Sequence, residues 1–388
     1  MWVIIMIYLD NAATTFPKPR ATVEAVARAM MLYGANPGRS AHRLSLRAAH
    51  EVWACREKLA RLIGASDPTH IIFCLNCTDA LNMAIQGSIK PGMHVITTAL
   101  EHNSVLRQLA PLKRSGNIEL TILQPDQNGT VTVEQFEQAF TPQTGLVVCT
   151  HASNVTGAIQ PVAGIGALCR KRGVRFVLDA AQTAGMLDIN ASAIGCDLIA
   201  MPGHKGLLGP QGTGLLLCGR DPEPLMQGGT GSISAEQDMP DFLPDRGEAG
   251  TVNVPGICGL AAGLSHIRRV GISSIAVREE RETARAAGGL RRLGVPVFTG
   301  PHQAGVLSFL PPDGDCEKAA QDFAARGVAL RAGLHCAPTA HESAGTLQTG
   351  TLRASFGPDA SPEQTRGILQ AASRLWGGGK HVGGLCPT

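Results

Sequence analysis

Short apolar runs alternate along the chain with longer segments of mixed polar and apolar character. Each run is long enough for one buried strand. The runs are "HIIFCL", "HVITTAL", "IELTILQP", "TGLVVCT", "VRFVLDA", "DLIAMP" and "TGLLLCG". Helix-like segments such as "TDALNMAIQGS" and "GIGALCRKRG" separate several of them. This alternation predicts an α/β fold whose large domain has a mostly parallel, seven-stranded sheet covered on both faces.

Two amphipathic helices are predicted before these strands. The segment "ATVEAVARAMMLYG" is typical of a helix that ends at Gly34, and "LRAAHEVWACREKLARLIG" of one that ends at Gly64. The apolar N-terminal stretch "MWVIIMIYLDNAATT" is too short to span a membrane and lacks a basic leader, so we interpret it as a buried strand. No other stretch reaches the length of a membrane span, and no membrane partner is expected.

The pattern changes near residue 255. An Ala/Arg-rich stretch after "TVNVPG" predicts a long helical region, and "GVLSFLPP" and "GTLRASFG" then predict strands of a smaller α+β unit. We therefore expect a large domain over residues 15–255. A small C-terminal domain is expected over residues 256–388, joined by the N-terminal residues 1–14.

Composition narrows the class of protein. Charged residues make up 17% of the 388 residues, below the roughly 25% typical of soluble domains, which favours a homo-oligomer that buries part of its surface. The net charge of +3 is too small to indicate a nucleic-acid partner. The 11 cysteines are an odd number without a secretion signal, so we predict no disulfide framework and a reducing, cytoplasmic location.

Candidate chemistry lies at two strand ends. Asp179 closes the run "VRFVLD", with Gln182 just beyond, and His204 and Lys205 follow the run "DLIAMP". Carboxyl ends of parallel strands line the ligand crevice, so the carboxylate and the amine should face it together. Such a pair suits pyridoxal phosphate, which a lysine binds covalently and whose ring nitrogen a carboxylate holds. A neighbouring cation should keep Asp179 ionised. The alternative is a surface lysine and a helix-capping aspartate.

The segment "FCLNCTDALNMAIQG" predicts a strand followed by a helix that Thr78 caps. N–H groups at such a helix start suit a phosphate, although an ordinary capped helix has the same pattern. Cys74 and Cys77 form a Cys-x-x-Cys pair, but no second pair accompanies them, so we predict structural cysteines and no metal site. His102, in "LEHNSVLR", is either structural or placed to stack on a cofactor ring or to move protons.

The octapeptide "RAGLHCAP" (residues 331–338) raises a separate question. Gly333 and Pro338 interrupt any apolar periodicity, which favours a loop around Cys336. A cysteine on a loop is either a small buried hydrophobe or a reactive thiol. The residues of the octapeptide alone leave both readings open.

Seven motifs taken in order resemble one known family. They are "YLDNAATT", "EHNSVLR", "SNVTGAIQPV", "LDAAQTAG", "GHKGLLGPQGTG", "EAGTVNVPG" and "RAGLHCAP". The set resembles the class V aminotransferases, specifically the cysteine desulfurases, and "RAGLHCA" is similar to the SufS-type branch that includes selenocysteine lyase-like enzymes. The resemblance covers nearly the whole chain. It implies the fold type I of pyridoxal-phosphate-dependent transferases, pyridoxal 5'-phosphate as cofactor, and conversion of L-cysteine to L-alanine with a persulfide on the enzyme.

The resemblance also implies roles for individual residues. Lys205 would carry the cofactor, Asp179 would hold its ring nitrogen, His102 would stack on its ring and assist proton transfer, and Cys336 would be the nucleophile. Cofactor contacts would further come from Asn154 and Gln182 at the phenolic oxygen, and from Cys77, Thr78, His204 and Thr251 at the phosphate. Thr251 would act from the other subunit of a homodimer with shared sites. Substrate contacts would come from Arg353 at the carboxylate, with Asn36, Arg39, His42 and Arg331 nearby.

Two positions depart from the family. Pro202 stands where many relatives have a serine, which removes a phosphate contact, and Leu334 replaces a histidine common before His-Cys. The short loop around Cys336 predicts limited reach, so the sulfur would pass to a docked acceptor protein or a thiol reductant. Three alternatives stay open: a selenocysteine lyase, another class V reaction such as aminotransfer or epimerisation in which Cys336 is incidental, and a non-catalytic scaffold.

Overall fold

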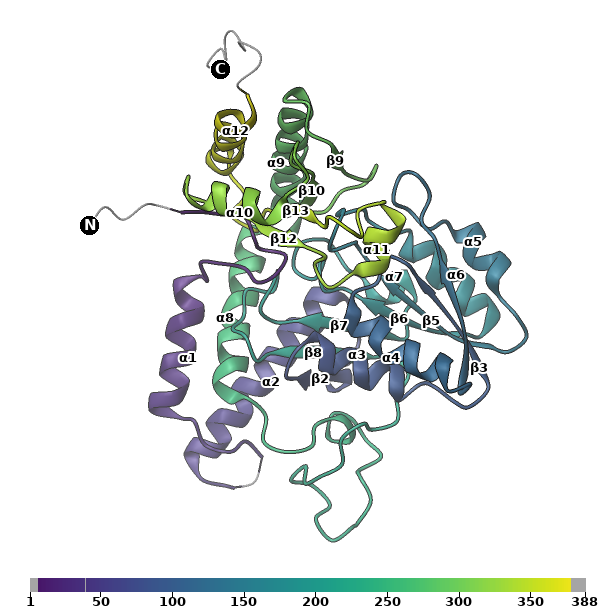
Figure 1. The fold of residues 1–388 in the computed structure, drawn as a ribbon. Coiled ribbons are helices and arrows are strands. Elements are labelled where there is room, and N and C mark those ends of the chain that lie inside the picture. Colours follow the sequence, from purple (N-terminus) through teal and green to yellow (C-terminus); the bar gives the residue numbers. More distant parts are fainter. Residues whose placement is uncertain (1–5, 39, 378–388) are drawn as a thin grey trace.

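The computed structural model describes residues 6–38 and 40–377, and its centre is one seven-stranded sheet (Figure 1). The strands are β2 (Ile71–Cys74), β3 (Met93–Thr98), β4 (Ile118–Leu123), β5 (Thr144–Thr150), β6 (Arg175–Asp179), β7 (Leu198–Pro202) and β8 (Gly214–Cys218). Their order is β2-β8-β7-β6-β5-β3-β4, and only β8 runs antiparallel to its neighbours. All seven predicted strands and the mostly parallel sheet are therefore confirmed.

Helices cover both faces of this sheet because successive strand residues point to opposite sides. In β8, Leu216 packs into the apolar cluster beneath α3 (Cys77–Gln86) and α4 (Asn103–Arg114), whereas Leu217 packs into the cluster on the other face. Helices that contribute to this second cluster include α1 (Arg20–Leu32), α2 (Arg43–Ile63), α5 (Val133–Ala139), α6 (Val162–Arg172), α7 (Ala191–Ile194) and α8 (Val254–Val270).

Helix ends follow local side-chain chemistry. Helix α2 ends at Gly64, as predicted, because this residue has a φ of 66°, which glycine adopts without a Cβ clash. Helix α3 corrects the sequence prediction, because Asn76 rather than Thr78 is its cap. The Asn76 side chain accepts a hydrogen bond from the amide of Asp79 at 3.0 Å. Both residue types favour such a position, and the extended backbone at Asn76 decides between them.

A second, antiparallel sheet has the order β12-β13-β10-β9. Its strands are β9 (Val297–Phe298), β10 (Val306–Phe309), β12 (Arg331–Gly333) and β13 (Thr351–Ser355). The helices that follow α8 are α9 (Ile272–Arg292), α10 (Cys316–Ala324), α11 (Pro338–Ser343) and α12 (Pro362–Trp376). The predicted long helical region is thus two helices, because Gly271, with a φ of 87°, ends α8 and precedes α9.

The N-terminal segment lies against this second sheet. Residues 1–5 of the predicted N-terminal strand lie outside the described residues, and the rest contains only the half-buried β1 (Ile7–Tyr8). β1 pairs in parallel with β11 (Val328–Ala329). The domain limits near residues 15 and 255 stay a prediction. Among the described helices, none is long and apolar enough to cross a membrane.

Candidate active site

A cavity of about 210 Å³ brings most of the predicted site residues together. It opens where β5, β6 and β7 end, and the loop that carries Cys336 closes its other side. The predicted residues that line it are Cys77, Thr78, His102, Asn154, Asp179, Gln182, His204, Lys205, Arg331, Cys336 and Arg353. Pro202 also lines the cavity, so the departure from the family pattern lies at the site itself.

Three predicted site residues are not brought to this cavity, and a fourth is not among the described residues. Asn36 and His42 are exposed, and the His42 side chain instead caps α2 by accepting from the amide of Ser45 at 3.2 Å. Arg39 lies outside the described residues. Thr251 is exposed and lines a different cavity of about 170 Å³.

Asp179 and Lys205 meet because β6 and β7 are adjacent and parallel, with Asp179 opposite Ala200. The Asp179 Oδ1 atom accepts hydrogen bonds from the amide of Ala181 at 2.8 Å and from the Cys77 thiol at 3.7 Å. Burial raises the pKa of Asp179, and the Ala181 amide and Lys205 offset part of that increase. The sequence predicted that a cation keeps Asp179 ionised. Lys205 does favour the ionised form, but burial has a larger and opposite effect on the pKa of Asp179.

Burial also lowers the pKa of the Lys205 amine. Cys77 and Asp179 oppose that shift, while Arg353 and Arg331 reinforce it. A lowered pKa increases the neutral fraction of the amine, which is the form that attacks a carbonyl carbon or accepts a proton. The amine and the carboxylate thus have the properties that covalent binding of an aldehyde cofactor requires.

Helix starts supply the next groups around the cavity. Cys77 and Thr78 begin α3, so their backbone N–H groups have no partner within the helix. His102 is the cap of α4, and its Nδ1 atom accepts from the amide of Ser104 at 3.1 Å. Burial and Lys205 lower the pKa of His102 to about 4, so its imidazole is neutral at physiological pH. A neutral ring can lie flat against an aromatic ligand without repelling nearby cations.

Two further polar residues are tied to the N-terminal segment. The Gln182 Nε2 atom donates to the carbonyl of Ala12 at 3.3 Å. The His204 Nδ1 atom lies 3.1 Å from the Thr14 hydroxyl, and burial lowers the pKa of His204 to about 4. A neutral His204 can donate one ring N–H to an anion but adds no positive charge to the cavity.

The segment "RAGLHCAP" is only partly the predicted loop. Arg331–Gly333 form β12, and the turn that follows leads into α11 at Pro338. Within that turn His335 and Cys336 both have positive φ values, 49° and 57°. Two hydrogen bonds hold these strained residues: Asn154 Nδ2 donates to the His335 carbonyl, and the Asn103 amide to the Cys336 carbonyl, each at 2.7 Å. Asn154 lines the cavity, and Asn103 lies between His102 and Ser104, which also line it.

Cys336 differs from the other cysteines of the described chain in exposure. It is exposed, whereas the other nine described cysteines are buried or half-buried. Burial raises the pKa values of the thiols of Cys74, Cys77 and Cys149, which keeps them protonated. Among the described cysteines, Cys336 alone therefore combines an exposed side chain with a place on the cavity wall.

Two acidic residues at the site were missed by the sequence prediction. Asp10 forms an ion pair with Arg353, with Oδ1 and Nη2 2.9 Å apart. Glu101, which precedes His102, is fully buried, and its Oε1 atom accepts from the Thr98 hydroxyl at 2.6 Å and from the Thr150 amide at 2.9 Å. Burial raises the pKa of Glu101 to about 8. No local sequence pattern distinguishes these two carboxylates from surface ones.

The pH dependence of stability tests the protonation of Glu101. Between pH 5 and 8 the unfolded chain has lost this proton while the folded chain retains it, so wild type becomes less stable as the pH rises. Relative to Glu101→Gln, which keeps the Oε1 acceptor, wild type should lose on the order of 1 kcal/mol of unfolding free energy per pH unit. Urea denaturation of both proteins at pH 5, 6, 7 and 8 measures this difference, and parallel profiles would contradict it.

The donor set fits pyridoxal phosphate and gives no indication of a metal. Asn154 Oδ1 is buried without a partner, Asp179 is a buried carboxylate beside the amine of Lys205, and the N-terminus of α3 opens on the same cavity. Among residues 6–38 and 40–377 no group of three or more His, Cys, Asp or Glu side chains is arranged to hold a metal ion. Asn154 Oδ1 matches the phenolic oxygen of that cofactor, and Asp179 matches its ring nitrogen. Lys205 matches its aldehyde, and the N-terminus of α3 matches its phosphate.

Comparisons with known proteins show which family the chain resembles. Residues 7–366 match the family model described as "Aminotransferase class-V". A protein named "Probable cysteine desulfurase" from Methanothermobacter thermautotrophicus is 35% identical over 365 residues, covering 90% of each chain. Another of the same name from Xylella fastidiosa is 34% identical, covering 90% of this chain and 86% of the other.

Solved structures give the same result at the level of the fold. The apo structure of a cysteine desulfurase from Thermococcus onnurineus NA1 superposes with a TM-score of 0.89 at 33% identity, covering 96% of this chain and 95% of the other. The cysteine desulfurase CsdA from Escherichia coli, in an S-sulfonic acid form, superposes with a TM-score of 0.87 at 28% identity, covering 95% and 94% of the two chains.

Proposed function

The chain belongs to the class V aminotransferase family, and we propose that it is a pyridoxal-phosphate-dependent cysteine desulfurase. It converts L-cysteine to L-alanine and leaves the sulfur as a persulfide on Cys336. One observation carries this proposal: Lys205, Asp179 and the exposed thiol of Cys336 line the same cavity. The fold is that of the fold type I pyridoxal-phosphate-dependent transferases, as the superposed cysteine desulfurases indicate.

The residues around the cavity divide the binding of the cofactor among them. Lys205 would bind its aldehyde and Asp179 its ring nitrogen. Asn154 and Gln182 would hold its phenolic oxygen, and His102 would lie against the ring. The start of α3 at Cys77 and Thr78, together with His204, would hold the phosphate. When bound, pyridoxal phosphate supplies an electron sink that makes the substrate's α-proton acidic.

The protein's own groups then move one proton and one sulfur atom. The neutral Lys205 amine accepts the α-proton, and the Cys336 thiolate attacks the substrate's sulfur. The carbon–sulfur bond breaks as the sulfur–sulfur bond forms, and the substrate's Cβ keeps the electron pair and takes a proton. Lys205 then returns a proton to Cα, which completes alanine. The sulfur leaves when an acceptor protein or a thiol reductant attacks the persulfide.

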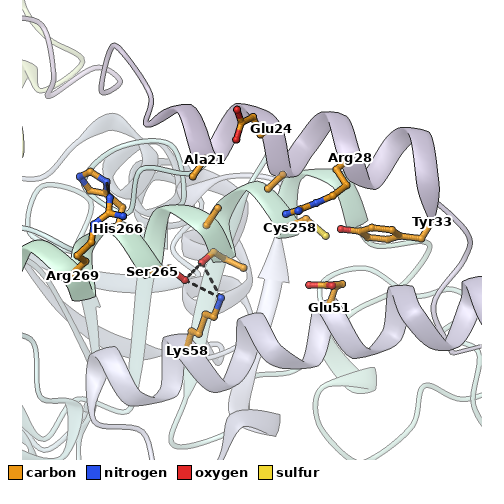
Figure 2. Close-up of a pocket in the computed structure, with 13 residues that line it drawn as sticks. Ala21, Glu24, Arg28, Tyr33, Glu51, Lys58, Cys258, Ser265, His266 and Arg269 are labelled. Carbon is orange, nitrogen blue, oxygen red and sulfur yellow. Dashed lines mark hydrogen bonds between the residues drawn. The ribbon is translucent and has the colours of Figure 1, made fainter.

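A homodimer with shared sites accounts for the surface of α1 and α2. A cavity of about 310 Å³ lies between α1, α2 and α8, and none of its lining residues belongs to the active site; Figure 2 shows these lining residues. Large apolar side chains are exposed on α1 and α2: Val23, Met30, Met31, Leu32, Leu44, Leu46 and Trp53. Thr251 is exposed as well, so that it is available to a partner subunit's cofactor phosphate. Such a concentration of apolar surface is typical of an interface.

A charge introduced on α1 tests the dimer. Met31 is 74% exposed, and Met31→Glu should shift the protein from dimer to monomer because a carboxylate would be desolvated in the interface. Val277→Glu is the matched control, since Val277 is 60% exposed on α9. Light scattering coupled to size exclusion measures both variants. A monomeric wild type, or a dimer that survives Met31→Glu, contradicts the proposed interface.

The activity itself is tested with three substrates. Purified enzyme with pyridoxal phosphate and a thiol reductant should release L-alanine and sulfide from L-cysteine in equal amounts, and alkylation followed by mass spectrometry should find the extra sulfur on Cys336. A much higher rate on L-selenocysteine would instead make the protein a selenocysteine lyase. Amino-group transfer to a 2-oxo acid without sulfide release would indicate another class V reaction. A protein that takes up no pyridoxal phosphate would be a scaffold.

The cellular setting follows from the same chemistry. Each turnover must end with the free thiol of Cys336 restored by an acceptor or a thiol reductant, so we place the enzyme in the cytoplasm, where its sulfur serves an acceptor such as the machinery that assembles iron–sulfur clusters. The short, doubly held turn around Cys336 favours transfer to a partner that docks at the mouth of the cavity.

A further inference from the structure

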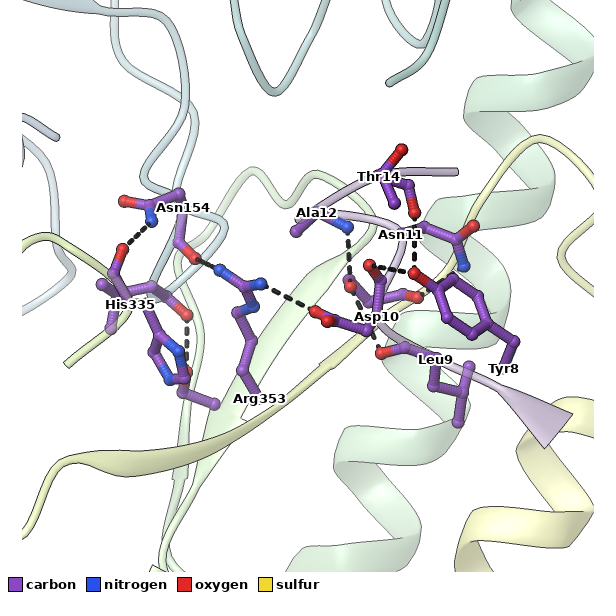
Figure 3. Close-up of polar contacts among 12 residues, drawn as sticks. Tyr8, Leu9, Asp10, Asn11, Ala12, Thr14, Asn154, His335 and Arg353 are labelled. Carbon is purple, nitrogen blue, oxygen red and sulfur yellow. Dashed lines mark hydrogen bonds and ion pairs between the residues drawn. The ribbon is translucent and has the colours of Figure 1, made fainter. Parts of the chain in front are cut away.

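The guanidinium group of Arg353 is held from two sides by the protein itself (Figure 3). Its Nη2 atom donates to Asp10 Oδ1 at 2.9 Å, and its Nη1 atom donates to the carbonyl of Asn154 at 3.1 Å. We propose that Asp10 is a positioning residue, which fixes the plane of the Arg353 guanidinium so that it can receive the substrate's carboxylate. This inference rests on the proposed function, in which Arg353 is the carboxylate site.

The backbone around Asp10 explains why its side chain reaches Arg353. Asp10 forms a parallel bridge with Ser355 of β13, and the Ser355 amide donates to the Leu9 carbonyl at 2.7 Å. The Tyr8 hydroxyl donates to the Asp10 carbonyl at 3.1 Å. Residues 353 and 355 lie on the same face of a strand. The N-terminal segment is therefore fixed along β13, and Asp10 is delivered to a position beside Arg353.

Burial gives the contact its importance. Arg353 is 2% exposed, and a guanidinium at that depth is costly unless a negative charge accompanies it. Burial lowers the pKa of Arg353, and Asp10 is the main group that opposes this shift. Asp10 therefore keeps the cation stable inside the site, where no other ion pair to Arg353 is found among residues 6–38 and 40–377.

Geometry gives Asp10 its effect on the substrate. A guanidinium has five N–H groups in one plane and binds a carboxylate best through two parallel hydrogen bonds. Asp10 and Asn154 each use one Nη hydrogen and together fix that plane. With Asp10 removed, one side of the plane is free, and the guanidinium can rotate away from the orientation in which two N–H groups meet the carboxylate.

The same network separates this role from the chemistry at Cys336. Asn154 also donates to the His335 carbonyl, so this hydrogen bond to the strained turn at residues 335 and 336 comes from Asn154 and not from Asp10. Removing the Asp10 side chain leaves that hydrogen bond in place. The loss should therefore appear in the recognition of the carboxylate and much less in the sulfur-transfer step.

Ligand binding that requires no sulfur chemistry provides the test. L-Alanine and ethylamine, which is alanine without its carboxylate, are titrated into the pyridoxal-phosphate-loaded enzyme while the visible absorption is followed. Wild type should bind alanine more tightly than ethylamine. Asp10→Ala should weaken alanine binding about tenfold and leave ethylamine unchanged, the loss expected for a charged hydrogen-bond partner. Asp10→Asn, which keeps an oxygen acceptor, should restore most of the preference.

Three results would overturn the inference. Tighter binding of alanine by Asp10→Ala would make Asp10 a competitor of the substrate. Equal weakening of both ligands would make it merely structural, and unchanged binding of both would leave it without a role. If wild type prefers alanine and Asp10→Ala abolishes that preference, but no sulfide is made from cysteine, the positioning role stands and the proposed desulfurase activity fails. With activity present, the KM of Asp10→Ala for L-cysteine should rise about tenfold while kcat changes less than about threefold.

Discussion

Replacing Lys205 with alanine is expected to abolish both the visible absorption of bound cofactor and the release of sulfur from L-cysteine. Lys205 supplies the amine that binds the aldehyde and then accepts the α-proton, so its loss removes two functions at once. We expect activity to fall by about 10⁴-fold or more, the range found when a nucleophile is removed from a catalytic unit. No other lysine is placed to substitute for it, because Lys205 is the only lysine among the described residues that lines the cavity.

Two measurements check this result. Absorption spectra of the dialysed protein report the covalent link to the cofactor, and an assay of alanine release reports turnover. Lys113→Ala is the control, since Lys113 is an exposed residue in the last turn of α4. A Lys205→Ala variant that keeps the absorption band and more than a few per cent of the activity would show that the amine at this site has been misassigned.

Replacing Cys336 with alanine should separate binding from sulfur transfer. The variant should take up pyridoxal phosphate as wild type does, because Cys336 contributes no group that holds the cofactor. Release of sulfide and of alanine should nevertheless fall by about 10³-fold or more, because no other exposed thiol lines the cavity in the part of the chain that the structure describes. Both products must fall together, since each sulfur removed leaves one alanine.

The control for this variant is Cys196→Ala. Cys196 is half-buried beyond α7 and outside the cavity, so its loss should leave the rate of alanine release unchanged. If Cys336→Ala and wild type release alanine and sulfide at the same rate, Cys336 is incidental and the strained turn at residues 335 and 336 has only a structural role. Release of alanine without any persulfide on wild-type Cys336 would place the sulfur acceptor elsewhere.

Local patterns predicted most of the fold. The seven strands were recognisable because each is a short apolar run that is buried in the sheet, and their spacing by helices indicated parallel neighbours. The reversed direction of β8 was not predictable in the same way. It depends on the short connection after Lys205, which is too short for a helical crossover and returns the chain antiparallel to β7.

The site was predictable where it depends on strand ends and not where it depends on distant pairs. Asp179 and Lys205 follow neighbouring strands, so a rule about sheet edges places them together. The contact between Asp10 and Arg353 joins residues 343 positions apart, and nothing near either residue in the sequence indicates the other. The same holds for Asn154 and His335, whose hydrogen bond determines how Cys336 is presented.

The uneven exposure of the cysteines has a practical and a chemical consequence. A thiol-specific dye added briefly to the folded protein should label Cys336 before any other described cysteine. The same difference in exposure determines which cysteine an oxidant reaches first. Hydrogen peroxide would act first on the residue that a reductant or an acceptor can restore, while the protonated interior thiols of the described chain escape damage.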